Sequence, residues 1–230
     1  MPNTNASQTV YAPGTKQDSH GFPTNSVNYI FIDTKPTVND SGDVDLNDLS
    51  TGTWARLAGG ISGATYAGNE TDTNDQYLDG DGYGDTSVDA KRGSLALTGN
   101  RKIGDPAQEY IASKMMAIGN DVRTRMIWIE NGNVVITSVT MSNIVPTGGN
   151  ANAKQTFSLT LNFNGRPRTV RGTITMTEKP DQPKIYTPSI SDTAPAEGQP
   201  QGKVIDSASE ITENTDPKAE DHSTTGGSDS

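Results

Sequence analysis

The sequence has no cysteine and only two histidines, His20 and His222, in 230 residues. Without cysteine there can be no disulfide framework, no thiolate metal site and no cysteine nucleophile. The two histidines stand near opposite ends of the chain, which argues against a serine or cysteine catalytic triad. These absences leave few groups for acid, base or nucleophilic catalysis, so we expect a protein that is not an enzyme.

Apolar residues are also scarce. They make up 31% of the chain without its 24 glycines and about 41% with them, against about 45–50% in globular proteins when glycine is counted. No apolar run approaches the roughly 18 residues that a membrane-spanning helix needs. The first thirteen residues lack the basic start and apolar stretch of a signal peptide. We therefore expect a soluble protein, without a membrane segment, that is made in the cytoplasm.

The two ends of the chain differ in composition from the middle. Residues 178–230 hold eleven Asp and Glu against four Lys and Arg, which accounts for seven of the ten net negative charges. Apolar periodicity is lost there, and such a segment cannot bury enough apolar surface to offset its ordering entropy. The sequence predicts an acidic, disordered tail over 178–230 and an N-terminal arm without a core of its own over 1–25.

The middle of the chain, residues 26–177, predicts a β-rich domain. Its clearest strand pattern, Thr156–Phe163, places Phe and Leu on one face and Thr, Ser and Asn on the other. Asn131-Gly132 predicts a type I′ hairpin, and Asn164-Gly165 predicts another turn. The expected fold is an antiparallel β-sandwich or open barrel. Strand patterns cover residues 27–33, 54–58, 94–98, 126–130, 134–144, 156–163 and 170–177.

One helix is predicted at about 105–118, flanking the sheet. Asp105 stands at the N-cap, Pro106 at the first helical position and Gln108 at the capping-box position. Gly119-Asn120 would end the helix. An apolar stripe with helical spacing would face the sheet, formed by Ala107, Tyr110, Ile111, Met115 and Ile118.

Residues 59–93 form the longest stretch without a regular apolar pattern and predict a long loop. Loops of this length are uncommon in compact domains and often functional. Asp79, Asp81 and Asp85 match part of a calcium-binding loop, but Tyr83 and Ala90 occupy the EF-hand positions five and twelve. These aspartates are candidate metal ligands, and the alternative interpretation is a solvated Gly/Asp turn.

Arg166, Arg168 and Arg171 form a short basic cluster near the end of the domain. The domain as a whole is mildly acidic, and no aromatic stacking motif accompanies the cluster. We interpret the cluster as an exposed strand face or a subunit contact in preference to a nucleic-acid site.

The run "YLDGDGYGDTSVDAKRGSLALTGNRKIGDPAQEYIASKM" joins an acidic DG-rich segment, a strand and the start of the predicted helix. In this order it resembles the major tail (tail tube) proteins of long, non-contractile-tailed bacteriophages. The resemblance runs from about Asn28 to Val170 and includes "ENGN" at 130–133, "IVPTGGNA" at 144–151 and "NGRP" at 164–167. The family pattern Gly-x-Arg-x-x-Gly-Asp-x-x-Gln is matched by Gly99, Arg101, Gly104, Asp105 and Gln108.

The resemblance implies a structural protein of the virion tail, assembled in the bacterial host cytoplasm. Subunits would form rings, six per ring in the usual case, that stack into a hollow tube. Implied partners are further copies of the chain, the tape measure protein, the tail terminator and distal tail proteins, and no cofactor is implied. DNA would pass through without sticking, since an acidic lumen repels phosphates. Candidates to line the lumen or contact the next ring are Glu70, Asp72, Asp75, Asp79, Asp81 and Asp85.

A second class of function remains open at this point. The chain would then be a secreted or surface β-sandwich module whose Asp/Gly loop binds calcium. The missing signal peptide and the broken ligand spacing argue against it. Calcium would raise the melting temperature if the loop were a true site.

Overall fold

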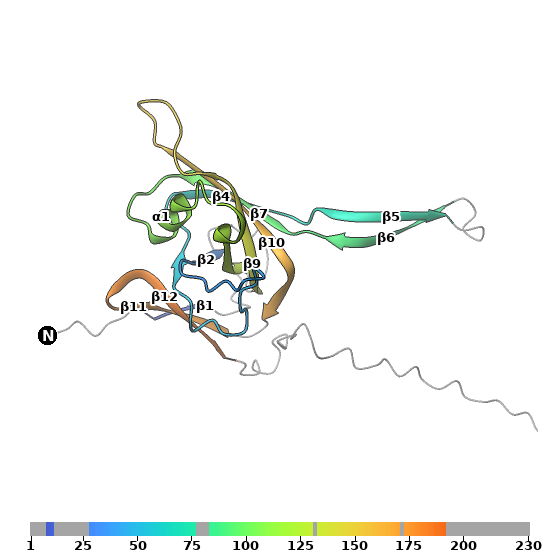
Figure 1. Cartoon of the computed structure of the whole chain (residues 1–230), viewed down its shortest axis with the longest axis horizontal. Coiled ribbons are helices and arrows are strands. Elements are labelled where there is room, and N and C mark those ends of the chain that lie inside the picture. The colour runs from blue at the N-terminus through green and yellow to red at the C-terminus, as the bar shows by residue number, and fades with distance from the viewer. Residues whose placement is uncertain (1–7, 12–27, 77–82, 131–132, 171–172, 192–230) are drawn as a thin grey trace, which may run out of the picture.

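The computed structural model describes residues 8–11, 28–76, 83–130, 133–170 and 173–191 (Figure 1). Its fold is mainly antiparallel β with one α-helix, α1 (Pro106–Ser113), as predicted from the sequence. The strands are β1 (Gln8–Tyr11), β2 (Tyr29–Asp33), β3 (Trp54–Arg56), β4 (Ile61–Ala67), β5 (Glu70–Gln76), β6 (Gly84–Lys91), β7 (Ser94–Asn100), β8 (Arg123–Glu130), β9 (Asn133–Val145), β10 (Thr156–Val170), β11 (Thr173–Lys179) and β12 (Gln182–Ser191).

Ten of these strands form one open sheet, and the other two form a separate ribbon. The sheet order is β1-β11-β12-β3-β2-β8-β9-β10-β7-β4, and β5 pairs with β6 alone. β8 and β9 meet as a hairpin in which Glu130 pairs with Asn133, as the Asn-Gly signal predicted. The two turn residues themselves lie outside the described residues.

The central strands are buried on both faces because the sheet separates two apolar clusters. Ile30 and Ile32 of β2 point into one cluster, called the first cluster below. Phe31 between them points into the other, called the second cluster. β8 divides its side chains in the same way, with Met126 and Trp128 on one side. Burial on both faces explains why β2 and residues 126–129 of β8 are apolar at successive positions instead of alternating between polar and apolar residues.

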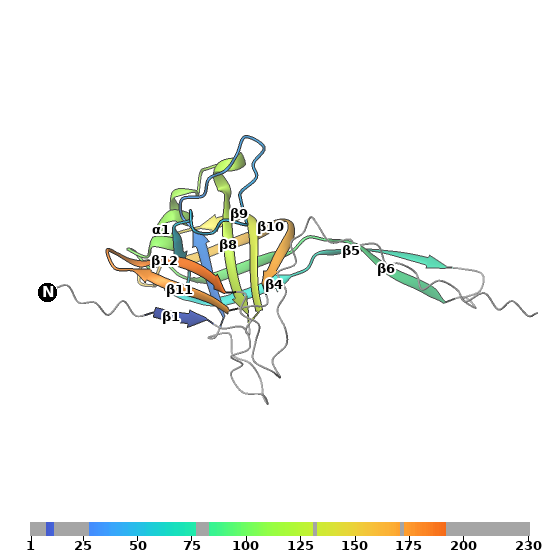
Figure 2. The same cartoon turned by 90° about the horizontal axis from the view of Figure 1, so that it is seen from below.

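The sheet curls so that its β4 end lies over the face of β8 (Figure 2). Tyr66 of β4 stacks on Trp128 of β8 with ring centroids 5.6 Å apart and lies 5.9 Å from the Phe163 ring of β10. The turn predicted at Asn164-Gly165 is wrong, because β10 continues through it as a bulge. Gly165 has φ of +71° there, a conformation that glycine adopts without a Cβ penalty.

α1 covers the first cluster but is shorter than predicted. Asp105 caps its first turn by accepting a hydrogen bond from the Gln108 amide, and Pro106 occupies the first turn. The helix ends at Ser113, whereas the apolar stripe predicted helix to about residue 118. The stripe is wrong beyond the helix end, since Met115 and Ile118 are exposed. A short 3-10 turn, η2 (Gly119–Val122), then leads into β8.

The predicted boundaries of the domain also change. The sequence placed residues 178–191 in a disordered tail, but β12 is a full strand that pairs with β11 and with β3. Ile185 and Tyr186 of β12 are buried, one in each apolar cluster. At the other end, Gln8–Tyr11 of the predicted arm pairs with β11 at the sheet edge. The rest of the predicted arm up to residue 25, and residues 192–230 of the tail, lie outside the described residues.

Candidate assembly surface

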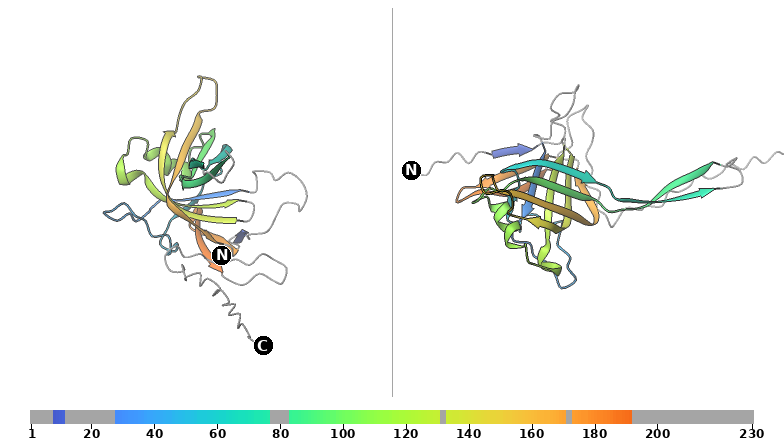
Figure 3. Two further views of the ribbon diagram at one scale, coloured as in Figure 1. Left: turned by 90° about the vertical axis from the view of Figure 1, so that its right-hand side faces the viewer. Right: turned by 90° about the horizontal axis from the view of Figure 1, so that it is seen from above.

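The predicted loop at 59–93 is wrong as a description of this segment, which is a long bent hairpin. β4 and β7 form its base in the main sheet, and β5 and β6 continue it as a ribbon projecting far from the body (Figures 1 and 3). Every described residue of β5 and β6 is exposed. The described part of the molecule thus leaves these two strands exposed, in a position where another molecule can contact them.

The ribbon is strongly acidic. Its described strands carry five carboxylates and one lysine. Asp75 and Asp85 are direct cross-strand partners, and like charges in that position destabilise a pair of strands. The only cross-strand ion pair in β5–β6 joins Lys91 to Glu70 at 2.6 Å, and this contact raises the pKa of the Lys91 ammonium. Two cross-strand hydrogen bonds also join β5 to β6. The Thr73 hydroxyl donates to the Asp89 carboxylate, and the Thr86 hydroxyl donates to the Asn74 side-chain oxygen.

The junction between ribbon and body is built from backbone bonds and one asparagine. Asn69 takes a left-handed conformation with φ of +45°, and its amide donates to the Arg92 carbonyl at 2.9 Å and to Ser94 Oγ at 3.0 Å. The Arg92 amide returns a bond to the Gly68 carbonyl at 2.9 Å. Gly93 lies against Phe163, where a Cβ would lie 2.7 Å from a ring carbon. The ribbon therefore leaves the sheet at a defined joint.

Four of the six predicted contact carboxylates lie together on the described ribbon: Glu70, Asp72 and Asp75 on β5, and Asp85 on β6. Asp79 and Asp81 lie outside the described residues. The candidate calcium ligands are thus represented here by Asp85 alone. Among the described residues, no three His, Asp or Glu side chains gather closely enough to hold a metal ion. Sequence reasoning missed the strands, although Thr71, Thr73, Thr86 and Val88 supply the β-branched residues that favour them.

The Gly-x-Arg-x-x-Gly-Asp-x-x-Gln residues come together as a clasp between β4, β7 and α1. Gly99 faces the backbone of Gly60 and Ile61, and a Cβ there would collide with the Gly60 carbonyl and lie 2.8 Å from Ile61 Cα. Gly104 has φ of +77°, which glycine adopts readily. Both glycines are thus required by the backbone.

Gln108 is the centre of the clasp. Its side chain is fully buried, and its Oε1 accepts from the Lys102 amide at 2.7 Å and from Arg101 Nη1 at 3.4 Å. Its Nε2 donates to the Gly59 and Asn100 carbonyls. The predicted capping-box role is wrong, because the amide of Asp105 donates to Lys102 O instead. Gln108 therefore satisfies the backbone where β7 passes into the helix.

Arg101 completes the clasp through Glu109. The Arg101 guanidinium lies 2.8 Å from the Glu109 carboxylate, and the Gly104 amide donates to the same carboxylate at 2.9 Å. The Gly104 bond and the guanidinium lower the pKa of Glu109. The motif that carries the family resemblance is thus a structural joint in this chain.

The next residue of α1, Tyr110, lies inside the body, and its burial raises the pKa of its hydroxyl to about 12.

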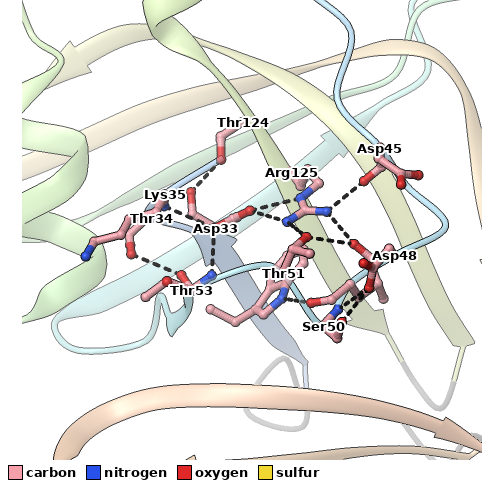
Figure 4. Close-up of polar contacts among 12 residues, drawn as sticks. Asp33, Thr34, Lys35, Asp45, Asp48, Ser50, Thr51, Thr53, Thr124 and Arg125 are labelled. Atoms are coloured by element: carbon pink, nitrogen blue, oxygen red, sulfur yellow. Dashed lines mark hydrogen bonds and ion pairs between the residues drawn. The ribbon is translucent and has the colours of Figure 1, made fainter. Parts of the chain in front are cut away.

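A second joint, which sequence reasoning missed, fixes the irregular segment 34–53 (Figure 4). Asp33, fully buried at the end of β2, accepts from the amides of Lys35 and Thr53 and so closes the base of the segment. Arg125 of β8 forms an ion pair with Asp33 through Nε at 2.9 Å and Nη2 at 2.7 Å. Its Nη1 donates to the Asp45 and Asp48 carbonyls, both at 2.7 Å.

Two more arginines hold the same segment by its backbone. Arg123 Nη1 donates to the Gly42 carbonyl at 2.6 Å, and Arg168 Nη1 donates to the Leu46 carbonyl at 3.0 Å. Of the predicted basic cluster, Arg168 thus serves the fold, Arg166 is exposed, and Arg171 lies outside the described residues. Leu49 from this segment is buried beside Trp54 in the second cluster. The segment is a fixed cover of the core, despite having almost no regular structure.

Comparisons with known proteins give structural neighbours only. No protein-family model and no curated protein matches the chain. A chain from the tail of an empty GTA particle with C6 symmetry aligns with a TM-score of 0.46 and 14% identity, covering 64% of this chain and 97% of that one. A chain from the virion of a native gene transfer agent particle aligns at 0.43 and 15%, covering 57% and 97%. No helix in the described part of the chain is long and apolar enough to cross a membrane.

Proposed function

We propose that the chain is a structural subunit of a phage-type tail, which joins copies of itself into a hollow tube. The observation that carries this proposal is the β5–β6 ribbon, which is exposed along its whole described length. Fixing a residue's backbone costs about 1–2 kcal/mol, and a lone two-stranded hairpin is at best marginally stable in water. A contact with another subunit would supply the burial that the ribbon lacks.

The sequence supports the more specific form of the proposal, a tail tube. The motif order from Asn28 to Val170 resembles tail tube proteins, and its clearest pattern builds the clasp at Gln108. In this form the subunits make hexameric rings, the rings stack, and the tube encloses the tape measure protein in a virion assembled in the host cytoplasm. Tail terminator and distal tail proteins would contact the two ends of the tube.

Removing the ribbon tests self-assembly directly. Asn69 and Arg92 already exchange backbone and side-chain hydrogen bonds, so an Asn-Gly turn can join them in place of residues 70–91. Negative-stain microscopy and sedimentation velocity should show rings or tubes for the full chain and monomers for the shortened one. The shortened protein should keep its melting temperature, since no residue of β5 or β6 belongs to either apolar cluster. A full chain that stays monomeric even in sulfate, which strengthens apolar association, would refute the proposal.

The acidity of the ribbon and of the whole chain fits a tube through which DNA slides. Binding to DNA depends on cationic contacts with phosphates and weakens steeply with salt. Assembled tubes should therefore show no measurable affinity for double-stranded DNA in fluorescence anisotropy, even at low ionic strength. Salt-sensitive DNA binding by the tubes would contradict the conducting role while leaving self-assembly in place.

A further inference from the structure

Large apolar side chains are exposed at both ends of α1. Ile103, just before the helix, is 83% exposed. After the helix, Met116 is 83% and Ile118 is 84% exposed, and Met115 is also exposed. Clusters of exposed apolar residues on a folded protein mark contact sites for other molecules.

The local backbone explains why these residues face outward. α1 stops at Ser113, and tight turns follow in which the Met115 amide bonds to Ala112 O at 3.2 Å and the Ala117 amide bonds to Lys114 O at 3.0 Å. Within residues 115–118 only Ala117 packs against the apolar cluster. The other three side chains, Met115, Met116 and Ile118, are exposed and belong to neither apolar cluster. They form an apolar surface on this turn.

Lysines stand beside both apolar groups. Lys102 precedes Ile103, and Lys114 precedes Met115 in the sequence. Of the neighbouring carboxylates, Glu109 is paired with Arg101, and Asp105 is buried as the helix cap with Lys184 3.8 Å away. Asp121 of η2 is exposed and lines the same hollow as Lys114. We call Lys102, Ile103, Lys114, Met115, Met116 and Ile118 the α1 seat. All of these side chains are exposed except Lys114, which is half-buried with its ammonium 5.6 Å from the centroid of the Tyr110 ring. It combines apolar surface with positive charge.

The ribbon has the complementary composition. Tyr83, just before β6, is 82% exposed and Val88 of β6 is 49% exposed. The two strands also carry five carboxylates. α1 and the ribbon lie at opposite ends of the molecule in two perpendicular views (Figures 1 and 2). The ribbon of one molecule therefore cannot contact the α1 seat of the same molecule and can contact only that of another copy.

We propose that the α1 seat receives the β5–β6 ribbon of a second copy of this chain. This inference rests on the proposed self-assembly and names the surface that it uses. The contact is head-to-tail, with different surfaces on the two subunits, and repeated contacts of this kind generate closed rings or open filaments. Opposite charges around an apolar centre would also set the orientation of the two partners.

Two variants that each lack one half of the contact test the proposal. M116S/I118S removes apolar side chains from the seat and keeps the ribbon, whereas the shortened variant lacks residues 70–91 and keeps the seat. Each alone should remain monomeric, or require an assembly concentration about tenfold higher than that of the full chain, as expected when exposed apolar side chains no longer become buried. Mixed together, they should still fail to form tubes, because the shortened variant has no ribbon to offer a third subunit.

The informative mixture is the shortened variant with the full chain carrying K102E/K114E. The intact seat of the shortened variant should accept the ribbon of the second protein and give a 1:1 complex in sedimentation velocity. N120A, a change at an exposed position of the neighbouring η2 turn that keeps every apolar side chain, is the control and should assemble normally. If the full chain forms tubes and M116S/I118S forms them equally well, the seat is wrong and self-assembly stands. If the full chain forms none, the proposed function itself fails.

Discussion

The buried ion pair between Asp33 and Arg125 gives the sharpest test of how this fold is held together. The Asp33 side chain is 0% exposed and the Arg125 side chain 3%. Replacing arginine in R125M leaves the carboxylate buried with only backbone amides as partners. It also removes the donors from the Asp45 and Asp48 carbonyls and the guanidinium that lies 5.3 Å from the Trp54 ring.

Breaking one side of a buried pair costs about 3–5 kcal/mol, because an unpaired charge remains inside the protein. We expect R125M and D33N each to lose about that much, a large part of the roughly 5–15 kcal/mol total of a typical domain. The double variant D33N/R125M should lose less than the two single losses combined, by about 1–3 kcal/mol, as residues that share a contact do.

Urea unfolding followed by tryptophan fluorescence measures these losses. Trp54 lies in the second cluster beside the ion pair, and Trp128 lies in the first. The fluorescence signal therefore follows the unfolding of both apolar clusters. R92M is the matched control, since Arg92 is exposed, and should change stability by under about 0.5 kcal/mol. If R125M loses no more than R92M, or if the two losses simply add, the ion pair does not fix segment 34–53 as described.

Three further predictions concern the clasp at α1. G99A should lower stability by about 1–3 kcal/mol, as overpacking does, because its Cβ would collide with the Gly60 carbonyl. G104A should lose about 1–2 kcal/mol from backbone strain alone, because φ is +77° there and its Cβ would meet no atom within 4 Å. An unchanged melting temperature in G99A would contradict the close approach of β4 and β7. Q108L should lose about 2–4 kcal/mol because it leaves several buried backbone groups unpaired, whereas Q108E tests whether the donated bonds to Gly59 and Asn100 matter. E109Q should lose about 1 kcal/mol at neutral pH, near the upper end for surface pairs, because the Glu109 side chain is 47% exposed while that of Arg101 is 9% exposed. Because the pKa of Glu109 is lowered in the fold, its contribution is present above its ordinary value and disappears as the pH falls through the lowered one; a gap between E109Q and the parent that persists in acid would exclude this origin.

Local patterns predicted the strands and the helix start well, because those depend on nearby residues. Phe157, Leu159 and Leu161 are all buried on one face, as their alternation indicated. The helix end was missed because Met115 and Ile118 keep the helical spacing, although the chain leaves the helix at Lys114. A periodic pattern records which positions are apolar, and exposed residues such as Met115 and Ile118 can continue that pattern without being core.

The joints could not be predicted from sequence, because they connect distant residues. Arg125 meets Asp33 across 92 positions, and Arg168 meets Leu46 across 122. Nothing near Arg168 distinguishes it from its exposed neighbour Arg166. The ribbon was missed for a different reason, since strands without a buried face lack the alternation that identifies strands. Its threonines were the remaining signal.

The contrast between body and ribbon determines the order in which this protein can act. The body holds two apolar clusters, a buried ion pair and a fully bonded Gln108, none of which involves β5 or β6. The ribbon has polar bonds and one exposed ion pair, and it contains the opposed carboxylates of Asp75 and Asp85. A body built this way can fold without the ribbon, and under the proposed function the ribbon becomes buried only on association. Changes in the ribbon should therefore alter assembly without altering the melting temperature of the monomer, whereas changes at Asp33 or Gln108 should alter both.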